Sequence, residues 1–252
     1  MSIRADGRSP EQLRPLHFER GFTGQAPGSV LVRMGRTTVL CTCTVEASVP
    51  PFLVGTGKGW MTAEYAMLPG STQTRKARER AGKVDGRSVE IQRLIGRAIR
   101  AVVDLSALGE RTLYLDCDVL EADGGTRTAA INGAFVALID ALHQPPPLRP
   151  EAPPWPSPHA VLRDSVAAVS VGLLGETVLL DLCYIEDRDA AVDLNLIATG
   201  SGKLVEVQAG GEEATFRRDQ LDALITLGLH GIRQIRDAQR TALGERWLWG
   251  GG

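Results

Sequence analysis

One stretch of the chain, Val119–Leu142, most constrains how it can fold. A strand-like run and a helix-like run meet there at two glycines, Gly124 and Gly125. Before the glycines, apolar and polar residues alternate, which predicts a strand with one buried face. After them, apolar residues recur at helical spacing, which predicts an amphipathic helix. With the strands and helices predicted elsewhere, the chain belongs to the α/β class in its mixed (α+β) form.

The bend between this strand and this helix is a candidate anion site. A helix N-terminus leaves backbone N–H groups without intrahelical partners, and such an end attracts phosphate. Arg127 adds a planar guanidinium that matches phosphate oxygens. A glycine turn of this kind is also a common packing device, so both interpretations stay open at this point.

The same patterns predict the other elements. They indicate β hairpins over 29–49, 167–185 and 191–208, a strand over 60–68, and helices over 88–105 and 217–243. Arg4–Arg20 is polar and charged and is expected to form an irregular arm. His143–His159 holds eight of the fourteen prolines and is expected to be an extended linker. The tail with Trp247 and Trp249 could pack or fray.

The net charge of the chain is −2, so its overall charge does not favour binding to nucleic acid. A polyanion would need a local basic patch, and Gly70–Arg87 offers one. Its cationic residues are Arg75, Lys76, Arg78, Arg80, Lys83 and Arg87. The segment is either a solvated loop or an electrostatic clamp for a phosphate backbone. Arg87 directly precedes the helix over 88–105, so Arg87 and Arg127 both lie at helix starts.

The cysteines at 41, 43, 117 and 183 lie in strand-like apolar runs, and no two form a CxxC pair. This pattern predicts reduced, buried thiols and a cytoplasmic protein. No apolar run reaches membrane-spanning length, and the N-terminus lacks the apolar core of a signal peptide.

Carboxylates crowd the stretch from 181 to 193. Asp181 lies in an apolar strand-like run, where a carboxylate needs an arginine, a metal ion or backbone N–H groups as its partner. Asp187 follows six residues later, past a bend. Such a pair can hold Mg²⁺ or divide acid–base work between its members. The alternative is an acidic surface turn, which we favour for Asp189.

Long motifs along the chain carry a resemblance to a known family. They are RADGR at 4–8, LRP at 13–15, GWMTAEYAMLP at 59–69, GRSVEIQRLIGRAIRAVVDL at 86–105, LDCDVLEADGGTRTA at 115–129, AAVSVG at 167–172 and DLCYIED at 181–187. In these motifs and their order the chain closely resembles the bacterial ribonuclease PH family of phosphate-dependent 3′-to-5′ exoribonucleases.

The resemblance implies a fold, a set of partners and an assembly. The fold would be a core like domain 2 of ribosomal protein S5 with a smaller C-terminal α/β subdomain. The domains would cover 1–142 and 161–252, joined by the Pro-rich linker at 143–160. The substrates would be tRNA precursors and other RNA 3′ ends, with inorganic phosphate as co-substrate and Mg²⁺ as cofactor. The assembly would be a homohexamer, a ring of three dimers.

The resemblance also implies roles for particular residues. Phosphate would be bound by Arg87, Gly125, Thr126 and Arg127. The catalytic residues would be Asp181, Asp187 and Arg127, and the Mg²⁺ ligands Asp181 and Asp187. The tRNA acceptor stem would be gripped by Arg75, Arg78 and Arg80. Gly70 departs from the family pattern, in which an arginine commonly follows Leu-Pro at this point.

Two other functions would fit parts of this sequence. A non-catalytic RNA-binding ring subunit of an exosome-like assembly would share the fold, but this chain retains both the arginines and the aspartates of the site, which favours the enzyme. A small-molecule kinase on a related fold is disfavoured, because no GxxxxGK[ST] motif is present.

Overall fold

The computed structural model describes residues 4, 6–78, 85–145, 154–211 and 214–250. The strands are β1 (Leu16–Arg20), β2 (Gly28–Met34), β3 (Thr37–Glu46), β4 (Trp60–Met67), β5 (Thr112–Glu121), β6 (Val166–Leu174), β7 (Thr177–Leu180), β8 (Val192–Thr199) and β9 (Leu204–Gly211). The helices are α1 (Gly86–Arg100), α2 (Leu105–Leu108), α3 (Thr126–Leu142), α4 (Pro158–Val161), α5 (Tyr184–Asp189) and α6 (Arg218–Leu243). Short 3₁₀ turns lie at η1 (Pro51–Leu53) and η2 (Gly244–Arg246).

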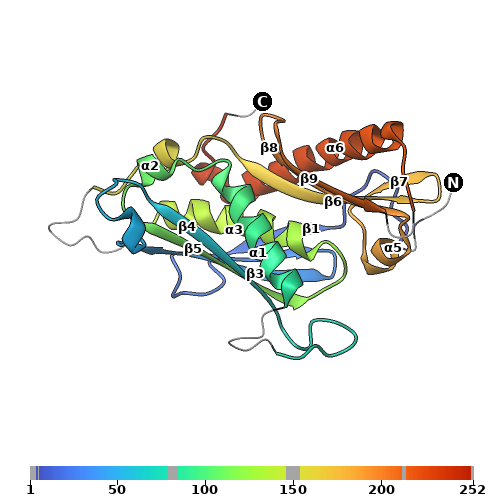
Figure 1. Ribbon diagram of the computed structural model, residues 1–252, viewed down its shortest axis with the longest axis horizontal. Coiled ribbons are helices and arrows are strands. Elements are labelled where there is room, and N and C mark those ends of the chain that lie inside the picture. Colours follow the sequence, from blue (N-terminus) through green and yellow to red (C-terminus); the bar gives the residue numbers. More distant parts are fainter. Residues whose placement is uncertain (1–3, 5, 79–84, 146–153, 212–213, 251–252) are drawn as a thin grey trace.

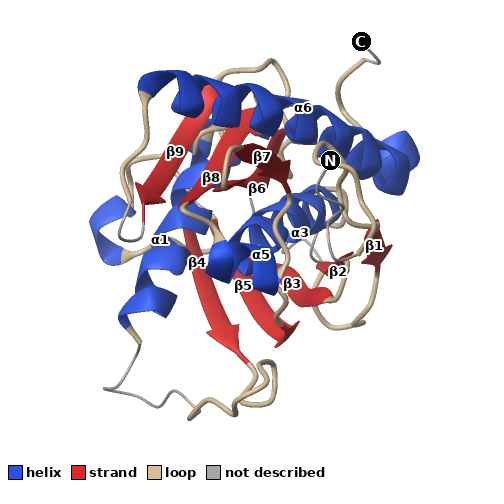
Figure 2. Ribbon diagram, turned by 90° about the vertical axis from the view of Figure 1, so that its right-hand side faces the viewer, coloured by secondary structure: helices blue, strands red, loops and turns tan. Residues whose placement is uncertain are grey.

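Within the described residues the strands form two sheets stacked with helices (Figures 1 and 2). The first sheet has the order β1-β2-β3-β5-β4, and the second has the order β7-β6-β8-β9. Neighbouring strands are antiparallel except β4 and β5, which are parallel. In Figure 2, α6 covers the outer side of the second sheet, and α1 and α3 lie between the sheets.

Helix α3 packs against β2 and β3 on one side and against β6 on the other. Every residue of this helix except Arg127 is buried. The prediction of an amphipathic helix was therefore wrong, because a second sheet covers the face that would otherwise meet water. The contact with β2 is close. A Cβ on Gly28 would lie 1.9 Å from the carbonyl oxygen of Ala137, so only a glycine fits there.

Most strands fall where alternation predicted them. The hairpin of β2 and β3 turns at Gly35, whose φ is 58°. On β5 the buried face is the predicted one and consists of Leu113, Leu115, Cys117 and Val119. The hairpins of β6 with β7 and of β8 with β9 are likewise present. The buried apolar side chains of both sheets join in a single cluster within the described part of the chain.

Two predictions about local structure were wrong. The expected irregular arm ends in β1, which pairs with β2 and buries Phe18, so cross-strand pairing orders a segment that looked too polar for a strand. The strand expected to run through 185 stops at Leu180, because Asp181 takes a left-handed φ of 54° that leaves the sheet. The chain then forms α5.

The Pro-rich segment is tied to the body of the protein where it is described. The Trp155 indole Nε1 donates to the Leu142 carbonyl oxygen at 2.8 Å, and Pro158–Val161 forms α4 rather than extended linker. Residues 146–153 lie outside the described part, and the proposed division into domains stays a prediction.

The C-terminal tail packs on α3. Trp249 stacks on Phe135 with ring centres 5.9 Å apart, and Trp247 meets Trp249 edge-on. The cysteines at 41, 43, 117 and 183 are free thiols, as predicted; the first three are buried as expected, whereas Cys183 is only half-buried. Among the described helices, none combines the length and the apolar character needed to cross a bilayer.

Candidate functional site

The turn between β5 and α3 has the tight geometry that its glycines predicted. Gly124 and Gly125 have φ angles of 76° and 64°, in the left-handed region that favours glycine. A Cβ on Gly124 would lie 2.5 Å from the carbonyl oxygen of Leu182. The turn therefore packs directly against the segment that follows β7, and α3 begins at its end with Thr126.

Tyr65 of β4 contacts Thr126, the first residue of α3. Its side chain is buried, and its hydroxyl donates a hydrogen bond of 2.8 Å to Thr126 Oγ1. Burial raises the pKa of Tyr65, while the Thr126 contact and the charges of Arg87 and Arg127 oppose that rise. Both predicted phosphate-binding arginines are thus close enough to act on one hydroxyl at the helix start.

Arg127 stands where three elements converge. Its Nη1 lies 3.4 Å from Glu90 Oε1 of α1 and 3.3 Å from Gln208 Oε1 of β9, and its side chain is 20% exposed. These are long contacts, and a guanidinium has five N–H donors, so donors remain for an anion. Arg87 is exposed in the first turn of α1, where its backbone N–H is capped by Asp85.

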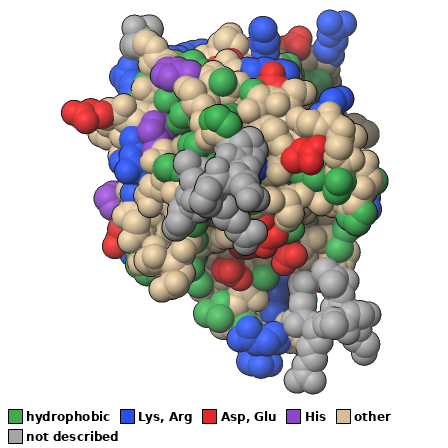
Figure 3. Space-filling model, turned by 90° about the vertical axis from the view of Figure 1, so that its left-hand side faces the viewer, with side chains coloured by type: hydrophobic (Ala, Val, Ile, Leu, Met, Phe, Trp, Pro, Cys, Tyr) green, Lys and Arg blue, Asp and Glu red, His purple; other side chains and the backbone are tan. Residues whose placement is uncertain are grey.

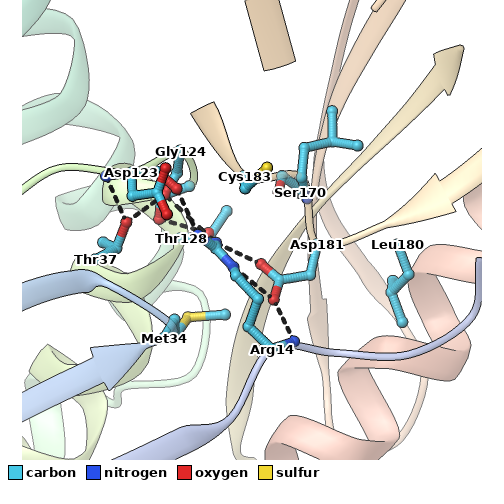
Figure 4. A network of polar contacts seen from close by, with 12 residues as sticks. Arg14, Met34, Thr37, Asp123, Gly124, Thr128, Ser170, Leu180, Asp181 and Cys183 are labelled. Atoms are coloured by element: carbon cyan, nitrogen blue, oxygen red, sulfur yellow. Dashed lines mark hydrogen bonds and ion pairs between the residues drawn. The ribbon is translucent and has the colours of Figure 1, made fainter. Parts of the chain in front are cut away.

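Asp181 is fully buried and forms an ion pair with Arg14 (Figure 4). Its Oδ2 accepts from the Arg14 backbone N–H at 2.8 Å and from Nε at 3.0 Å, and its Oδ1 accepts from Nη2 at 2.7 Å. Burial by itself would lower the pKa of Arg14, but the Asp181 carboxylate outweighs burial and raises it. Of the partners considered for Asp181 from the sequence, the structure thus contains arginine and a backbone N–H; besides Arg14, Arg8 Nη1 lies 3.7 Å from Asp181 Oδ2.

Arg14 also reaches the turn at 123–125 between β5 and α3, the predicted phosphate turn. Its Nη1 donates to the carbonyl oxygen of Asp123 at 2.5 Å, and its Nη2 lies 3.4 Å from that of Gly124. The sequence analysis missed this residue. The signal was present in the LRP motif at 13–15 and in the stated need of Asp181 for a cationic partner.

Two more arginines of the N-terminal arm hold the acidic segment. Arg4 forms a two-point ion pair with Glu186, at 2.6 and 2.5 Å, and donates to the Leu180 and Asp181 carbonyl oxygens. Arg8 donates to the same Asp181 oxygen at 3.0 Å. Asp187 comes directly after this anchored segment and is exposed on α5.

The described part of the basic loop, at 70–78, carries the predicted RNA-binding residues Arg75 and Arg78 and projects away from the body in Figure 1. Arg75 and Arg78 are exposed and form no ion pair within the described part of the chain, while Arg80 lies outside it. Figure 3 shows Lys and Arg side chains gathered at the lower end of the face that it presents.

The two predicted metal ligands differ in how well they fit Mg²⁺. Proteins commonly bind this ion through one or two carboxylates together with water and substrate phosphates. The exposed Asp187 suits that arrangement better than the buried Asp181, whose oxygens accept from Arg14. Among the described residues, no group of three or more His, Cys, Asp and Glu side chains could hold a metal by itself.

Comparison with known proteins gives consistent matches along the chain. Residues 12–143 match the model of the 3′ exoribonuclease family, domain 1, and residues 164–231 match domain 2 of the same family. A protein of Rhodopirellula baltica named Ribonuclease PH is 55% identical over 244 residues, which are 96% of this chain and 99% of that protein.

Solved structures agree in fold. Rice Rrp46 superposes with a TM-score of 0.77 at 22% identity, covering 95% of this chain and 99% of that chain. An Archaeoglobus fulgidus exosome solved with RNA bound to the active site gives a TM-score of 0.79 at 23% identity, covering 93% and 91%. At such identities the likeness supports the fold alone.

Proposed function

Because this chain belongs to the 3′ exoribonuclease family, we propose that it is a phosphate-dependent exoribonuclease of the ribonuclease PH type. It trims the 3′ ends of tRNA precursors and other RNA. The single observation that carries this proposal is the start of α3, where Thr126 and Arg127 adjoin a buried tyrosine within reach of the Arg87 charge.

The reaction is phosphorolysis. An oxygen of inorganic phosphate attacks the phosphorus of the last phosphodiester bond, the bond to the 3′ oxygen breaks, and a nucleoside diphosphate leaves. Arg127, Arg87, the Thr126 hydroxyl and the Gly125 backbone hold the attacking phosphate. Because phosphate is already a nucleophile, positioning and charge neutralisation supply most of the rate enhancement. One phosphate linkage replaces another, so the reaction is reversible.

Asp181 and Asp187 form the acidic side of the proposed site. Asp187 is exposed and could supply the proton that the leaving 3′ oxygen takes up. Mg²⁺ held by Asp187 would offset the negative charge that gathers at the reacting phosphorus. Metal ligation and proton donation are alternative roles for this carboxylate, and a pH–rate profile at saturating Mg²⁺ separates them.

Arg75, Arg78 and Arg80 are the proposed grip on the RNA backbone. Arg75 and Arg78 are exposed and form no ion pair among the described residues, so they can exchange counterions for phosphates. The proposed assembly is a homohexamer built as a ring of three dimers. A cytoplasmic location belongs to the same proposal and is supported by the free thiols.

The test uses a tRNA precursor with a 3′ extension, incubated with Mg²⁺ in the presence and absence of inorganic phosphate. Trimming should require phosphate and release nucleoside diphosphates, and added nucleoside diphosphates should extend the RNA. Equal trimming in phosphate-free buffer, with nucleoside monophosphates as products, would indicate hydrolysis. RNA binding without trimming in either buffer would favour the non-catalytic ring subunit.

A further inference from the structure

We propose that Arg14 is a positioning residue of the phosphorolytic site, which sets the acidic segment Asp181–Asp187 against the turn that binds phosphate. The proposal rests on the proposed function, because it concerns how the two sides of that site are held together. It assigns Arg14 no contact with substrate.

The contacts of Arg14 span two distant parts of the chain. The guanidinium bonds to Asp181, which is 167 residues away, and to the Asp123 carbonyl oxygen, which is 109 residues away. It is 4% exposed, and each of its three nitrogen atoms donates at least one hydrogen bond. A lysine ammonium is a compact point charge and cannot reproduce this planar fork toward both segments.

Asp181 itself is held in a conformation that needs support. Among the described residues it is the one non-glycine residue with a positive φ, a conformation in which the Cβ of an L-residue crowds the following carbonyl oxygen. Its backbone N–H donates to the Ser170 carbonyl oxygen at 2.7 Å, and the next N–H donates to Ser170 Oγ at 3.1 Å. The bend fixed in this way turns the chain from β7 into α5, which carries Asp187.

The phosphate turn is fixed from the same side. The carbonyl oxygens of Asp123 and Gly124 face Arg14, and the Gly124 carbonyl oxygen also accepts from Thr37 Oγ1 at 2.7 Å (Figure 4). The side chain of Asp123 in turn accepts from the Tyr184 backbone N–H at 3.2 Å, at the start of α5. Arg14 therefore lies at the joint between the turn and the acidic segment, where a displacement of either one would change the distance between phosphate and acid.

The protein contains a matched arginine at the other end of α3. Arg20 grips Asp140 with Nε at 2.8 Å and Nη2 at 2.5 Å, and its Nη1 donates to the Ala242 carbonyl oxygen. Arg14 and Arg20 thus both make a fork to an aspartate and a carbonyl, but Arg20 is 26% exposed against 4% for Arg14, and its Asp140 also pairs with Arg246. Of the two, Arg14 is the one that adjoins the phosphate turn. If Arg14 merely stabilises the fold, the activity of variants at both positions should fall only as far as their stability falls.

The experiment compares Arg14→Lys, Arg14→Ala and Arg20→Ala with the wild type, at a temperature where circular dichroism shows each protein folded. The first readout is amide hydrogen exchange without substrate. Both Arg14 variants should lose protection in the turn at 123–127 and in the segment 181–187 together, while Arg20→Ala should lose it near the C-terminal end of α3. Loss of protection in only one of the two segments would overturn the proposal, and so would wild-type protection in Arg14→Lys. Both outcomes count whatever reaction the protein catalyses.

The second readout is phosphorolysis. The kcat of Arg14→Lys should fall about 100-fold, the usual scale for a misplaced reacting group, while Arg20→Ala keeps the wild-type kcat. Millimolar guanidinium ion should restore part of the activity of Arg14→Ala and none of that of Arg14→Lys, which has no cavity for it. Equal losses in Arg14→Ala and Arg20→Ala would overturn the positioning role. A wild type that trims without phosphate would contradict the proposed function instead.

Discussion

The hydroxyl of Tyr65 determines how Thr126 faces the phosphate turn. Because the Tyr65 O–H donates to Thr126 Oγ1, the proton of Thr126 remains available for a phosphate oxygen. Burial raises the pKa of Tyr65 above its ordinary value despite the two nearby arginines, so the phenol stays protonated at neutral pH. One buried tyrosine thereby orients a hydroxyl that would otherwise rotate.

Replacing this hydroxyl should weaken phosphate binding selectively. Tyr65→Phe should raise the KM for phosphate by about 2–10-fold, which corresponds to one hydrogen bond of about 0.5–1.5 kcal/mol. The kcat at saturating phosphate and the KM for RNA should change little. Tyr114→Phe, on the opposite face of the same sheet, is the control. Steady-state kinetics in which both variants shifted the phosphate KM equally would remove Tyr65 from the site.

At the scale of elements, α3 shows what local sequence can and cannot predict. Its start and its helical character follow from the glycines and from the apolar spacing. Its second neighbour, β6, does not follow, because a contact between segments far apart in sequence leaves no trace in local periodicity. The sequence contains one indication of this second neighbour, because the helix also carries apolar residues on the side opposite its predicted buried face. They are Ala129, Ala130, Val136, Ala137 and Ile139.

The end of β7 is a second feature that local sequence does not predict. The run of apolar residues continues past Leu180, so the sequence predicts strand, while the chain bends at Asp181, which Arg14 of the N-terminal arm binds. The roles of Arg87, Thr126, Arg127 and Asp187 could be proposed from motifs. The residue that connects their segments, Arg14, lies in the LRP motif, but its partners could not be predicted from that motif, because a motif does not show which distant segments meet.

The close packing of α3 on β2 gives a prediction about stability. Gly28→Ala should lower the free energy of unfolding by about 1–3 kcal/mol, since its Cβ would overlap the Ala137 carbonyl and force the helix away. Gly24→Ala is the control, because a Cβ there meets nothing within 4 Å. Chemical denaturation measures both. A Gly28→Ala protein as stable as Gly24→Ala would show that the helix and strand are not so closely packed.

At the scale of the whole molecule, the outer face of the first sheet carries like charges. Asp116 of β5 is paired in register with Glu64 of β4, and Asp118 lies two residues further on the same face. The pKa values of Asp116 and Asp118 are both raised, first by burial and then by the charge of Glu64. This face therefore costs the folded state free energy when its carboxylates ionise.

The sign of the pH dependence follows from these raised pKa values. The folded state binds these protons more tightly than the unfolded chain does, so stability falls as pH rises from the ordinary aspartate pKa of about 3.8 through the higher folded-state pKa. Asp116→Asn should therefore raise the free energy of unfolding at neutral pH, and the gain should disappear below that range.

Asp189→Asn is the control for this measurement, because the hydrogen bond from Arg188 lowers the pKa of Asp189 and neutralising it brings no such gain. Denaturation of each variant across pH measures the effect. An Asp116→Asn protein that is less stable than the wild type at neutral pH would show that the charged carboxylate is satisfied in the folded state.

The most direct test concerns the claim that the start of α3 holds the attacking phosphate. The measurement is kcat/KM for phosphate in Arg127→Ala, with Arg97→Ala as the control, since Arg97 also bridges α1 and β9 through its ion pair with Glu206. If Arg127 binds the reacting phosphate, its loss should lower that value at least 100-fold, or about 3 kcal/mol, with RNA affinity retained and Arg97→Ala near wild type. Near-normal phosphate dependence in Arg127→Ala, or an equal loss in Arg97→Ala, would contradict the claim.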